Sequence, residues 1–311
     1  MKGNIALENK LNNTKSLFLS IVGCPNVGKS SLMNMIINSK VSIVSAKPQT
    51  TRGKITGILT HGDTQLVFSD TPGLHSPRNK LGDYMVAEVN TSLSGAEMCL
   101  HVVEAGKQIT ETDKKIIKKF INGNMDAVLI INKIDKLKDK TKLISEIDSW
   151  SKLFDYKAII PVSAKTGDGR AELVDQLCSF AKPSVFFFDE NDVTDQTERM
   201  LVSEVVREKM LRLLDDELPH GIAVEVEQFK DKTETESNIE AVIYCEKPNH
   251  KSIIIGKNGS MIKNIGTSAR LELQEMFERK INLKLWVKVK ENWRNKDMFL
   301  RSLGYSENSI N

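Results

Sequence analysis

Gly23-Cys24-Pro25-Asn26-Val27-Gly28-Lys29-Ser30 fits the phosphate-binding pattern G-x-x-x-x-G-K-[ST]. An apolar run over 17–22 precedes it and a helix-like stretch over 31–37 follows it, which is the strand–loop–helix setting that the pattern requires. The two glycines let successive backbone N–H groups point inward and hold an anion. Lys29 can then reach the β- and γ-phosphates of a nucleotide, and the Ser30 hydroxyl can bind Mg²⁺. The flanking elements favour this interpretation over an ordinary glycine-rich turn.

The bulk composition indicates a soluble globular protein. The chain has 311 residues, enough for about two domains that each bury a core. Its net charge is only +3, so a nucleic-acid partner would require a local basic patch. The four cysteines form no C-x-x-C pair, which predicts reduced thiols in a cytoplasmic protein. No apolar run approaches the length of a membrane span, and residues 1–15 lack a secretory signal pattern.

Short apolar strands alternate with helical patterns up to about residue 181. The strands are expected near 17–22, 54–60, 65–69, 98–103, 127–131 and 157–161, and the helices near 29–38, 82–94, 112–122, 142–154 and 170–181. This alternation predicts an α/β fold with a mostly parallel six-stranded sheet and helices on both faces. Ligands of such sheets bind at the carboxyl ends of the strands, where the phosphate loop lies.

Three further motifs follow in the order expected of a guanine-nucleotide switch, each directly after a strand. In Asp70-Thr71-Pro72-Gly73, the Asp70 carboxylate can hold Mg²⁺ through a water and the Gly73 N–H can meet the γ-phosphate. The second motif is Asn132-Lys133-Ile134-Asp135 and the third is Ser163-Ala164-Lys165. D-x-x-G and S-A-K are weak signals alone, but four motifs in order at strand ends predict one nucleotide site.

The second and third motifs predict selectivity for guanine. Asp135 can accept two hydrogen bonds, from guanine N1–H and N2–H₂, whereas adenine offers neither donor. Asn132 can bridge the base and the phosphate loop, the Lys133 stem can lie on the ring face, and N–H groups of 163–165 can bond guanine O6. The predicted nucleotide-binding residues are Gly23, Cys24, Pro25, Asn26, Val27, Gly28, Lys29, Ser30, Ser31, Asp70, Thr71, Pro72, Gly73, Leu74, Asn132, Lys133, Asp135, Ser163, Ala164 and Lys165.

Over about residues 16–182 the chain resembles the Ras-like GTPases of the translation-factor class. The resemblance implies GTP hydrolysis, and it identifies the polar stretch Gln49-Thr50-Thr51-Arg52 as the first switch. Thr51 (or Thr50) would join Mg²⁺ in the GTP state, so the expected metal ligands are Ser30, Thr51 and Asp70. A plain surface loop is the alternative for this stretch, because loops are commonly polar.

Leu74 is a departure from the Ras pattern. Ras-type enzymes carry a water-orienting Gln after the D-x-x-G glycine, and a leucine cannot orient water. Either another group positions the water, or intrinsic hydrolysis is slow and waits for a partner. In related GTPases an Asn at the place of Asn26 helps to hold K⁺, so K⁺-stimulated hydrolysis is one hypothesis and a loop-shaping role for Asn26 is the alternative. The residues expected to serve catalysis are Lys29, Thr51, Gly73 and Asn26.

The composition changes after Pro183. Residues 184–195 are aromatic and then acidic, which predicts a linker that packs at its start. A helix is expected next, with Asp195-x-x-Glu198 as its capping box. Strands are expected over 222–227 and 239–245, joined by a polar loop over 230–237. In the last strand Leu283, Leu285, Val287 and Val289 are expected to face the core and Lys284, Trp286, Lys288 and Lys290 the other side. That lysine face is either an RNA contact or an ordinary solvated surface.

The segment Ile253-Ile-Ile-Gly-Lys-Asn-Gly-Ser-Met-Ile262 joins an apolar helical turn to a long helix. G-x-x-G between two helices is the loop by which KH domains hold single-stranded nucleic acid. Residues 247–263 contain four lysines and no acidic residue, which supplies a local positive potential. The α-β-β-α-α-β order and these lysines favour a KH domain over an ordinary helix–helix turn. The predicted RNA-binding residues are Lys251, Ile254, Ile255, Gly256, Lys257, Asn258, Gly259, Lys263 and Lys288.

A Ras-like GTPase domain followed by a type II KH domain is the arrangement of the Era family. The stretches that resemble this family are Lys47-Pro48-Gln49-Thr50-Thr51-Arg52, Asp70-Thr71-Pro72-Gly73-Leu74-His75, Asp195 with Glu198-Arg199, Glu217-Leu218-Pro219 and Asn292-Trp293-Arg294. We expect the GTPase domain over 16–182, a linker over 183–195, the KH domain over 196–291 and a C-terminal tail over 292–311. Cys24 and Glu104 depart from the family pattern, which has Arg and Asp there.

The resemblance implies a role in bacterial ribosome biogenesis. It implies GTP-dependent binding to the 3′ end of 16S rRNA and maturation of the 30S subunit, by a monomeric cytoplasmic protein that is also found at the inner face of the cell membrane. Membrane association has no independent sign in the sequence. Two alternatives stay open: another RNA-associated assembly GTPase, and an RNA-binding protein that uses GTP only as a structural ligand, which Leu74 keeps open.

Overall fold

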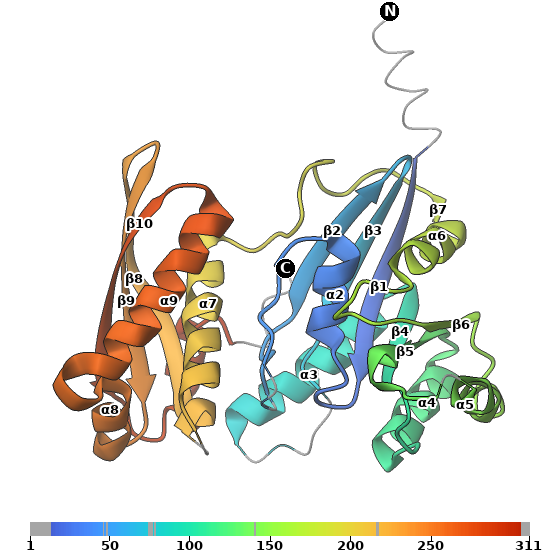
Figure 1. The fold of residues 1–311 in the computed structure, drawn as a ribbon, viewed down its shortest axis with the longest axis horizontal. Helices are drawn as coiled ribbons and strands as arrows, with labels where there is room; N and C mark the ends of the chain where they lie inside the picture. Colours follow the sequence, from blue (N-terminus) through green and yellow to red (C-terminus); the bar gives the residue numbers. More distant parts are fainter. Residues whose placement is uncertain are drawn as a thin grey trace, which may run out of the picture. The chain divides into compact units, whose positions relative to one another are not determined.

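The computed structural model describes residues 14–45, 47, 49–73, 77, 79–139, 141–215 and 218–305. They form two compact units. The first comprises the described residues within Met1–Ser42, Thr51–His75 and Val86–Asp195, and the second those within Ile43–Thr50, Ser76–Met85 and Gln196–Asn311. Figure 1 shows that each unit is built on its own sheet with helices packed against it. Two short pieces of the amino-terminal half therefore belong to the carboxy-terminal unit.

The sheet of the first unit has the expected strands. They are β1 (Lys15–Gly23), β2 (Ile55–His61), β3 (Thr64–Asp70), β4 (Met98–Glu104), β5 (Asp126–Asn132) and β6 (Ala158–Pro161), in the order β2-β3-β1-β4-β5-β6. The pairs are parallel except that β2 runs antiparallel to β3. The prediction of a mostly parallel sheet is confirmed. A two-residue strand, β7 (Lys182–Pro183), adds a seventh strand antiparallel to β1 that the sequence did not predict.

Helices cover both faces of this sheet, as the alternating pattern predicts. They are α2 (Lys29–Ile37), α3 (Lys80–Ser94), α4 (Glu111–Gly123), α5 (Lys142–Ser151) and α6 (Arg170–Phe180), with a short 3₁₀ turn η1 (Ile134–Lys136). Side chains of α2 and α6 share one core cluster with inward residues of β1, β3, β4 and β5. Side chains of α3, α4 and α5 pack in separate clusters with residues from the other face, such as Val22 and Cys99.

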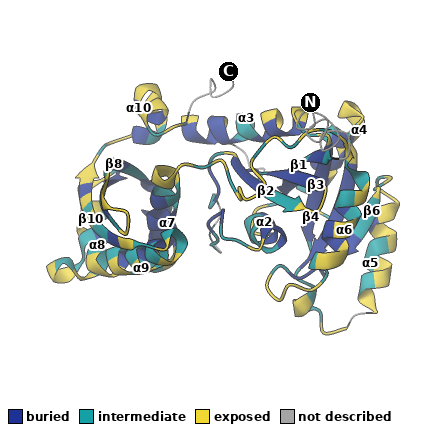
Figure 2. Ribbon diagram, turned by 90° about the horizontal axis from the view of Figure 1, so that it is seen from above, coloured by how far each residue is buried: buried dark blue, intermediate teal, exposed yellow. Residues whose placement is uncertain are grey.

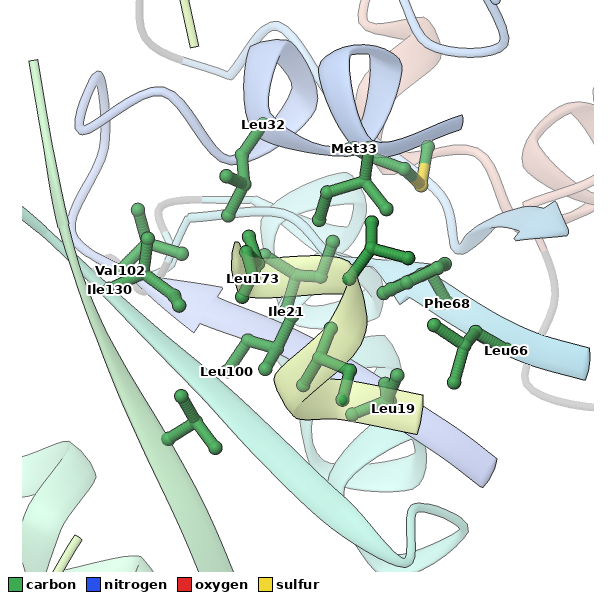
Figure 3. Packing of buried hydrophobic residues seen from close by; sticks show 14 of the residues in the cluster. Leu19, Ile21, Leu32, Met33, Leu66, Phe68, Leu100, Val102, Ile130 and Leu173 are labelled. Carbon is green, nitrogen blue, oxygen red and sulfur yellow. The ribbon is translucent and has the colours of Figure 1, made fainter. Parts of the chain in front are cut away.

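The cluster under α2 fixes the two ends of the phosphate loop. Successive strand side chains point to opposite faces, so Leu19 and Ile21 of β1 share the sheet face that α2 and α6 cover. They share one core cluster with Leu32 and Met33 of α2, and all four are at most 1% exposed (Figure 3). Burial of each such side chain stabilises the fold by about 1.5–3 kcal/mol. Because β1 ends at Gly23 and α2 begins at Lys29, this packing holds the loop between them in place.

The linker lies along the first unit. The ring of Phe187 meets Phe18 edge-on, with centroids 4.9 Å apart. The Gln65 side-chain oxygen accepts hydrogen bonds from the N–H groups of Phe187 and Phe188, at 2.8 and 3.1 Å. Packing at the start of the linker is therefore as expected. The contact continues to its end, because Ile58 of the edge strand β2 donates its N–H to the Val193 carbonyl at 2.9 Å.

A buried polar network joins β4 to α4. His101 is fully buried, with Nδ1 2.8 Å from the Tyr156 hydroxyl and Nε2 3.5 Å from Asp113 Oδ1. Asp113 also forms the predicted capping box of α4 with Thr110. Burial lowers the pKa of His101, so its ring is neutral near pH 7. Burial would raise the pKa of Asp113, but the hydrogen bonds from His101 and Thr110 outweigh it and lower that pKa to about 2.

We predict that His101 makes stability pH-dependent. An unfolded histidine binds a proton below about pH 6.5, whereas the buried ring does not. The unfolded state then binds more protons than the folded state, so stability falls as pH falls through that window. Urea unfolding between pH 7 and 5 should show a shallower fall in His101→Phe than in the unchanged protein. His61→Phe, which changes an exposed histidine, is the control. Equal slopes in the unchanged protein and His101→Phe would contradict the prediction.

The second unit has a three-stranded sheet in the order β10-β9-β8. β8 (Ile222–Thr233) pairs antiparallel with β9 (Glu236–Cys245), and β10 (Lys280–Val289) pairs parallel with β9. The helices are α7 (Glu198–Leu213), η2 (Leu218–Gly221), α8 (Pro248–Ile255), η3 (Lys257–Gly259), α9 (Ser260–Phe277), η4 (Trp293–Asn295) and α10 (Asp297–Ser302). The predicted α-β-β-α-α-β order is confirmed. Figure 2 shows α7 largely buried, whereas α8 and α9 carry exposed residues.

Three local predictions in this unit are wrong. Helix α7 is capped by Thr197, whose hydroxyl accepts from the Met200 N–H, and not by Asp195. The expected loop over 230–237 is mostly strand, because β8 and β9 continue to a turn at 234–235. Val289 is the last residue of β10 and is 36% exposed, so the core side chains of this strand end at Val287.

The expected C-terminal tail forms ordered structure up to residue 305. Trp293 is fully buried, and its indole N–H donates to the Gly221 carbonyl at 2.9 Å. It packs in a cluster with Val242, Tyr244 and Phe299. Val242 and Tyr244 alternate along β9 with Ala241 and Ile243 of the α7–α9 cluster, so this segment covers the opposite face of the sheet.

We predict that Trp293→Ala destabilises the second unit strongly. Deletion of a fully buried tryptophan leaves a cavity and should lower the free energy of unfolding by about 3–5 kcal/mol. Trp286→Ala is the matched control, because that indole is 55% exposed and should change stability by only about 0.5 kcal/mol. Hydrogen exchange of the β9 amides measures both effects within this unit. Similar loss of protection in the two variants would contradict the buried role of Trp293.

Candidate nucleotide and RNA sites

The phosphate loop fits its surroundings only with glycine at its two ends. A Cβ on Gly23 would lie 2.3 Å from the Val102 carbonyl oxygen. Gly28 has φ +100°, and a Cβ there would lie 2.4 Å from Nδ2 of Asn132. The loop is thus held close to β4 and to the first base-binding motif, with the left-handed backbone that a phosphate cradle needs.

Lys29 is the first residue of α2, and its side chain reaches back to the loop. Its Nζ donates to the carbonyl oxygens of Gly23 and Cys24, at 3.2 and 3.1 Å. Burial lowers the pKa of this ammonium, and the Asp70 carboxylate partly opposes the shift. A phosphate anion at the loop would further favour the charged form, which is the role expected of this lysine.

Asp70 collects three hydroxyl groups at the end of β3. Its Oδ2 accepts from Ser30 at 2.6 Å, from Ser42 at 3.0 Å and from Thr51 at 3.3 Å. The Ser30 and Thr51 hydroxyls lie 3.0 Å apart. The structure therefore brings together all three predicted metal ligands. Ser42 was not predicted, because an isolated serine between apolar residues carries no sequence signal.

The donor set around Asp70 fits a hard divalent cation. Asp70 is fully buried, and its Oδ1 has no hydrogen-bond partner among the described residues. Burial raises the pKa of Asp70, and Lys29 and the surrounding hydroxyls oppose that rise. A buried carboxylate oxygen without a partner, beside two hydroxyls and a phosphate loop, matches the oxygen ligands that Mg²⁺ prefers with a nucleotide.

Of the two candidate switch threonines, the geometry favours Thr51. The Thr51 hydroxyl lies at Ser30 and Asp70, whereas the Thr50 hydroxyl donates to the Lys47 carbonyl at 2.6 Å. In the D-x-x-G motif Thr71 is buried and donates to the Ile21 carbonyl at 2.9 Å. Leu74 lies outside the described residues.

Asn132 ties the base motifs to the phosphate loop. Its Nδ2 donates to the Val27 carbonyl at 2.9 Å. Its Oδ1 accepts from the N–H groups of Lys133 at 2.8 Å and Ala164 at 3.0 Å. One buried amide therefore fixes three of the four motifs relative to one another.

The base-recognition residues are held by a second set of contacts. Asp135 accepts from the Ser163 hydroxyl at 2.7 Å, which orients the carboxylate predicted to read guanine. Lys133 donates to the Asn26 carbonyl and to Glu104, both at 2.6 Å. Burial would raise the pKa of Glu104, but Lys133 and Lys136 outweigh it and lower that pKa. Glu104, noted in the sequence only as a departure from the family pattern, thus orients Lys133.

The G-x-x-G segment forms a tight turn between α8 and α9. Gly256 has φ +73°, and a Cβ there would lie 2.7 Å from the Met261 Cβ. Asn258 and Gly259 also have left-handed backbones, with φ of +52° and +76°. The turn leads into the N-terminus of the 18-residue helix α9, whose free N–H groups favour an anion.

The side chains around this turn differ in their access to a ligand. Lys251, Lys257 and Lys263 are exposed. Ile254 is fully buried in the core, so the prediction that it contacts RNA is corrected: its side chain anchors α8 instead. Lys288 is exposed on β10 and forms an ion pair with Glu227 at 2.8 Å, as expected of a solvated face.

Comparison with known proteins decides the family. Residues 18–133 match the family model described as a 50S ribosome-binding GTPase, and residues 217–294 match the KH domain. GTPase Era of Ruminiclostridium cellulolyticum is 47% identical over 94% of this chain and 98% of its own length. GTPase Era of Clostridioides difficile is 44% identical over 94% of this chain and 99% of its own length. This chain belongs to the Era family of GTPases.

Two solved Era structures share the fold along almost the whole chain. A crystal structure of Era in complex with MgGDPNP and nucleotides 1506–1542 of 16S ribosomal RNA matches with a TM-score of 0.90 and 36% identity, over 94% of this chain and 99% of that one. A single-residue variant of Aquifex aeolicus Era bound to GDP·AlF₄⁻ also matches with a TM-score of 0.90 and 36% identity, over 94% of this chain and 100% of that one. As an Era-family member the protein is a GTPase that carries a KH domain, so GTP is a substrate and not only a structural ligand.

The structure also bears on thiols and membranes. The four cysteines are free, as predicted. Within the part of the chain that the structure describes, every helix is too short or too polar to cross a bilayer.

Proposed function

We propose that this Era-family GTPase binds GTP with Mg²⁺ in its first unit, binds the 3′ end of 16S rRNA through its KH domain, and acts in maturation of the 30S ribosomal subunit. One observation carries the proposal: the chain combines two sites. In the first unit, hydroxyl groups gather at Asp70 and Ser163 orients Asp135 for the base. In the second unit, exposed lysines surround a G-x-x-G turn. The Era relative solved with MgGDPNP and 16S nucleotides supports it.

The chain's own residues supply positioning and charge. Inward N–H groups of the phosphate loop and the Lys29 ammonium would hold the phosphates, and Ser30, Thr51 and Asp70 would hold Mg²⁺, which would neutralise charge on the β- and γ-phosphates. The Gly73 N–H meets the γ-phosphate. Asp135 and Asn132 select guanine, and the contacts with Ser163 and Val27 keep these two side chains in place.

We predict that hydrolysis is faster in K⁺ than in Na⁺. Asn26 has a left-handed backbone, with φ +64°, and its carbonyl is fixed by Lys133. A K⁺ ion beside it would act like an arginine finger, which is worth about 10³–10⁵ in kcat, so we expect at least about a tenfold higher kcat in K⁺. Asn26→Ala should remove the difference. Equal phosphate-release rates in the two salts at the same ionic strength would overturn this role.

We predict that Lys257 contributes to RNA affinity through phosphate charge. Lys257→Ala should weaken binding of a 16S 3′-tail oligonucleotide and lower the slope of log K against log salt by about 0.7, the value for one phosphate contact on a single strand. Fluorescence anisotropy at several salt concentrations measures both. Lys118→Ala, an exposed lysine on α4, is the control. An unchanged slope would remove Lys257 from the interface.

A second candidate is another RNA-associated assembly GTPase, and one observation favours it. The family model over residues 18–133 is described as a 50S ribosome-binding GTPase. This match covers only part of the GTPase domain, whereas the full-length relatives are Era proteins. Crosslinking the protein to RNA in cells and sequencing the fragments separates the two: 16S 3′-end fragments support the proposal, and 23S fragments support the alternative.

The remaining parts of the proposal rest on the family resemblance. We place the protein in the cytoplasm as a monomer with peripheral association at the cytoplasmic side of the cell membrane. Fractionation of cells and sedimentation of the purified protein test these assignments.

A further inference from the structure

Helix α7 binds the backbone of the segment Ile43–Thr50, which is part of the carboxy-terminal unit. At one end of the segment, the Val44 N–H donates to Glu208 Oε1 at 2.9 Å. The Val44 carbonyl accepts from the Arg212 guanidinium at 3.2 Å. Arg212 also donates to Glu208 at 2.8 Å, which closes a ring of three contacts around one residue's backbone.

The other end of the segment is held in the same way. The Arg207 guanidinium donates to the Thr50 carbonyl, and Glu204 accepts from the same guanidinium. Between the two ends, the Lys47 ammonium donates to the Leu214 carbonyl at the end of α7. We call Arg207, Glu208 and Arg212 the α7 clasp. Its contacts to the segment are to main-chain atoms, so they fix the backbone at Val44 and at Thr50.

The α7 clasp uses buried charges. Glu208 is fully buried, and Arg207 is 1% exposed. Burial of an ion is unfavourable unless partners offset it, and apolar residues of the same size would hold α7 against its neighbours at a lower cost. The presence of Arg207 and Glu208 in the core, despite that cost, indicates that the segment needs defined hydrogen bonds.

The residues next to the segment lie at the nucleotide site. Ser42 and Thr51 belong to the first unit, and both donate to Asp70 Oδ2, at 3.0 and 3.3 Å. Thr51 directly follows Thr50, whose carbonyl the α7 clasp holds. One residue spans only about 3.3–3.6 Å, so a shift of the Thr51 backbone relative to Asp70 acts on the clasped peptide group.

We propose that the α7 clasp is a positioning element of the GTPase site. By fixing the backbone at Val44 and Thr50, it sets where the Thr51 hydroxyl lies relative to Asp70. Helix α7 also joins α9, the helix after the G-x-x-G turn, through the Lys209–Glu272 ion pair and a shared core cluster. Because coupling is reciprocal, the nucleotide state at Asp70 changes RNA affinity of the KH domain through α7. This inference rests on the proposed RNA-binding function, and it names the side chains that transmit its regulation.

The experiment measures coupling in the full chain. The affinity of a 16S 3′-tail oligonucleotide is determined with Mg²⁺ and GDPNP and again with Mg²⁺ and GDP, and the ratio of the two dissociation constants gives the coupling. Coupling of this kind typically changes affinity about 5–150-fold. Arg207→Met should bring the ratio close to 1. The double variant Arg212→Met with Lys47→Met should reduce the ratio about threefold or more. Because the Arg212 side chain is 51% exposed, this variant tests the clasp even if Arg207→Met does not fold.

Arg199→Met is the matched control. It makes the same change on the same helix, and Arg199 also donates to a carbonyl, at 2.9 Å, but that carbonyl belongs to Val226 of β8. The ratio should be unchanged in this variant. A purely structural role of α7 would shift RNA affinity equally with both nucleotides and leave the ratio constant in every variant.

A double-mutant cycle with Thr51→Ala tests the route. If the clasp acts through Thr51, the effects of Thr51→Ala and Arg212→Met on kcat are non-additive. Additive effects on kcat would overturn the inference. So would clasp variants whose ratio of RNA dissociation constants equals that of the unchanged protein. A ratio of 1 in the unchanged protein would instead overturn the switch in the proposed function, so the two failures are distinguishable.

Discussion

The buried carboxylate of Asp70 is the constraint on which the nucleotide site depends. It lies at the end of β3, fully buried, so hydrogen-bond donors brought from elsewhere must stabilise it. Those groups are the hydroxyls of Ser30 in α2, of Ser42 before the segment Ile43–Thr50, and of Thr51 in the first switch. Their convergence on one oxygen makes the position of the switch depend on what else Asp70 binds.

The sequence predicted most of the nucleotide site because its four motifs each lie at a strand end. The alternation of strands and helices was enough to bring Asp70, Asn132 and Ser163 to one edge of the sheet. What it could not predict were contacts between residues far apart in the chain without a shared motif. Ser42 on Asp70 and Val44 on Glu208 are of this kind, because a lone serine or a backbone N–H leaves no pattern.

Local errors had local causes. Asp195 and Glu198 have the spacing of a capping box, but Thr197 lies between them and caps α7 with its own hydroxyl. Ile254 adjoins the glycine turn, which favours an RNA contact, but its place on α8 turns its side chain into the core. In both cases two interpretations fit the same short stretch, and only packing against the rest of the unit decides between them.

The course of the linker has a consequence for solubility. β2 is the outer strand of the first sheet, and an open outer strand can recruit a strand from another molecule and begin aggregation. The linker covers part of that edge. The Val193 carbonyl accepts a hydrogen bond from the Ile58 N–H, and the Thr194 hydroxyl donates one to the Thr56 carbonyl. The segment that joins the two domains thus also shields the GTPase sheet from unwanted self-association.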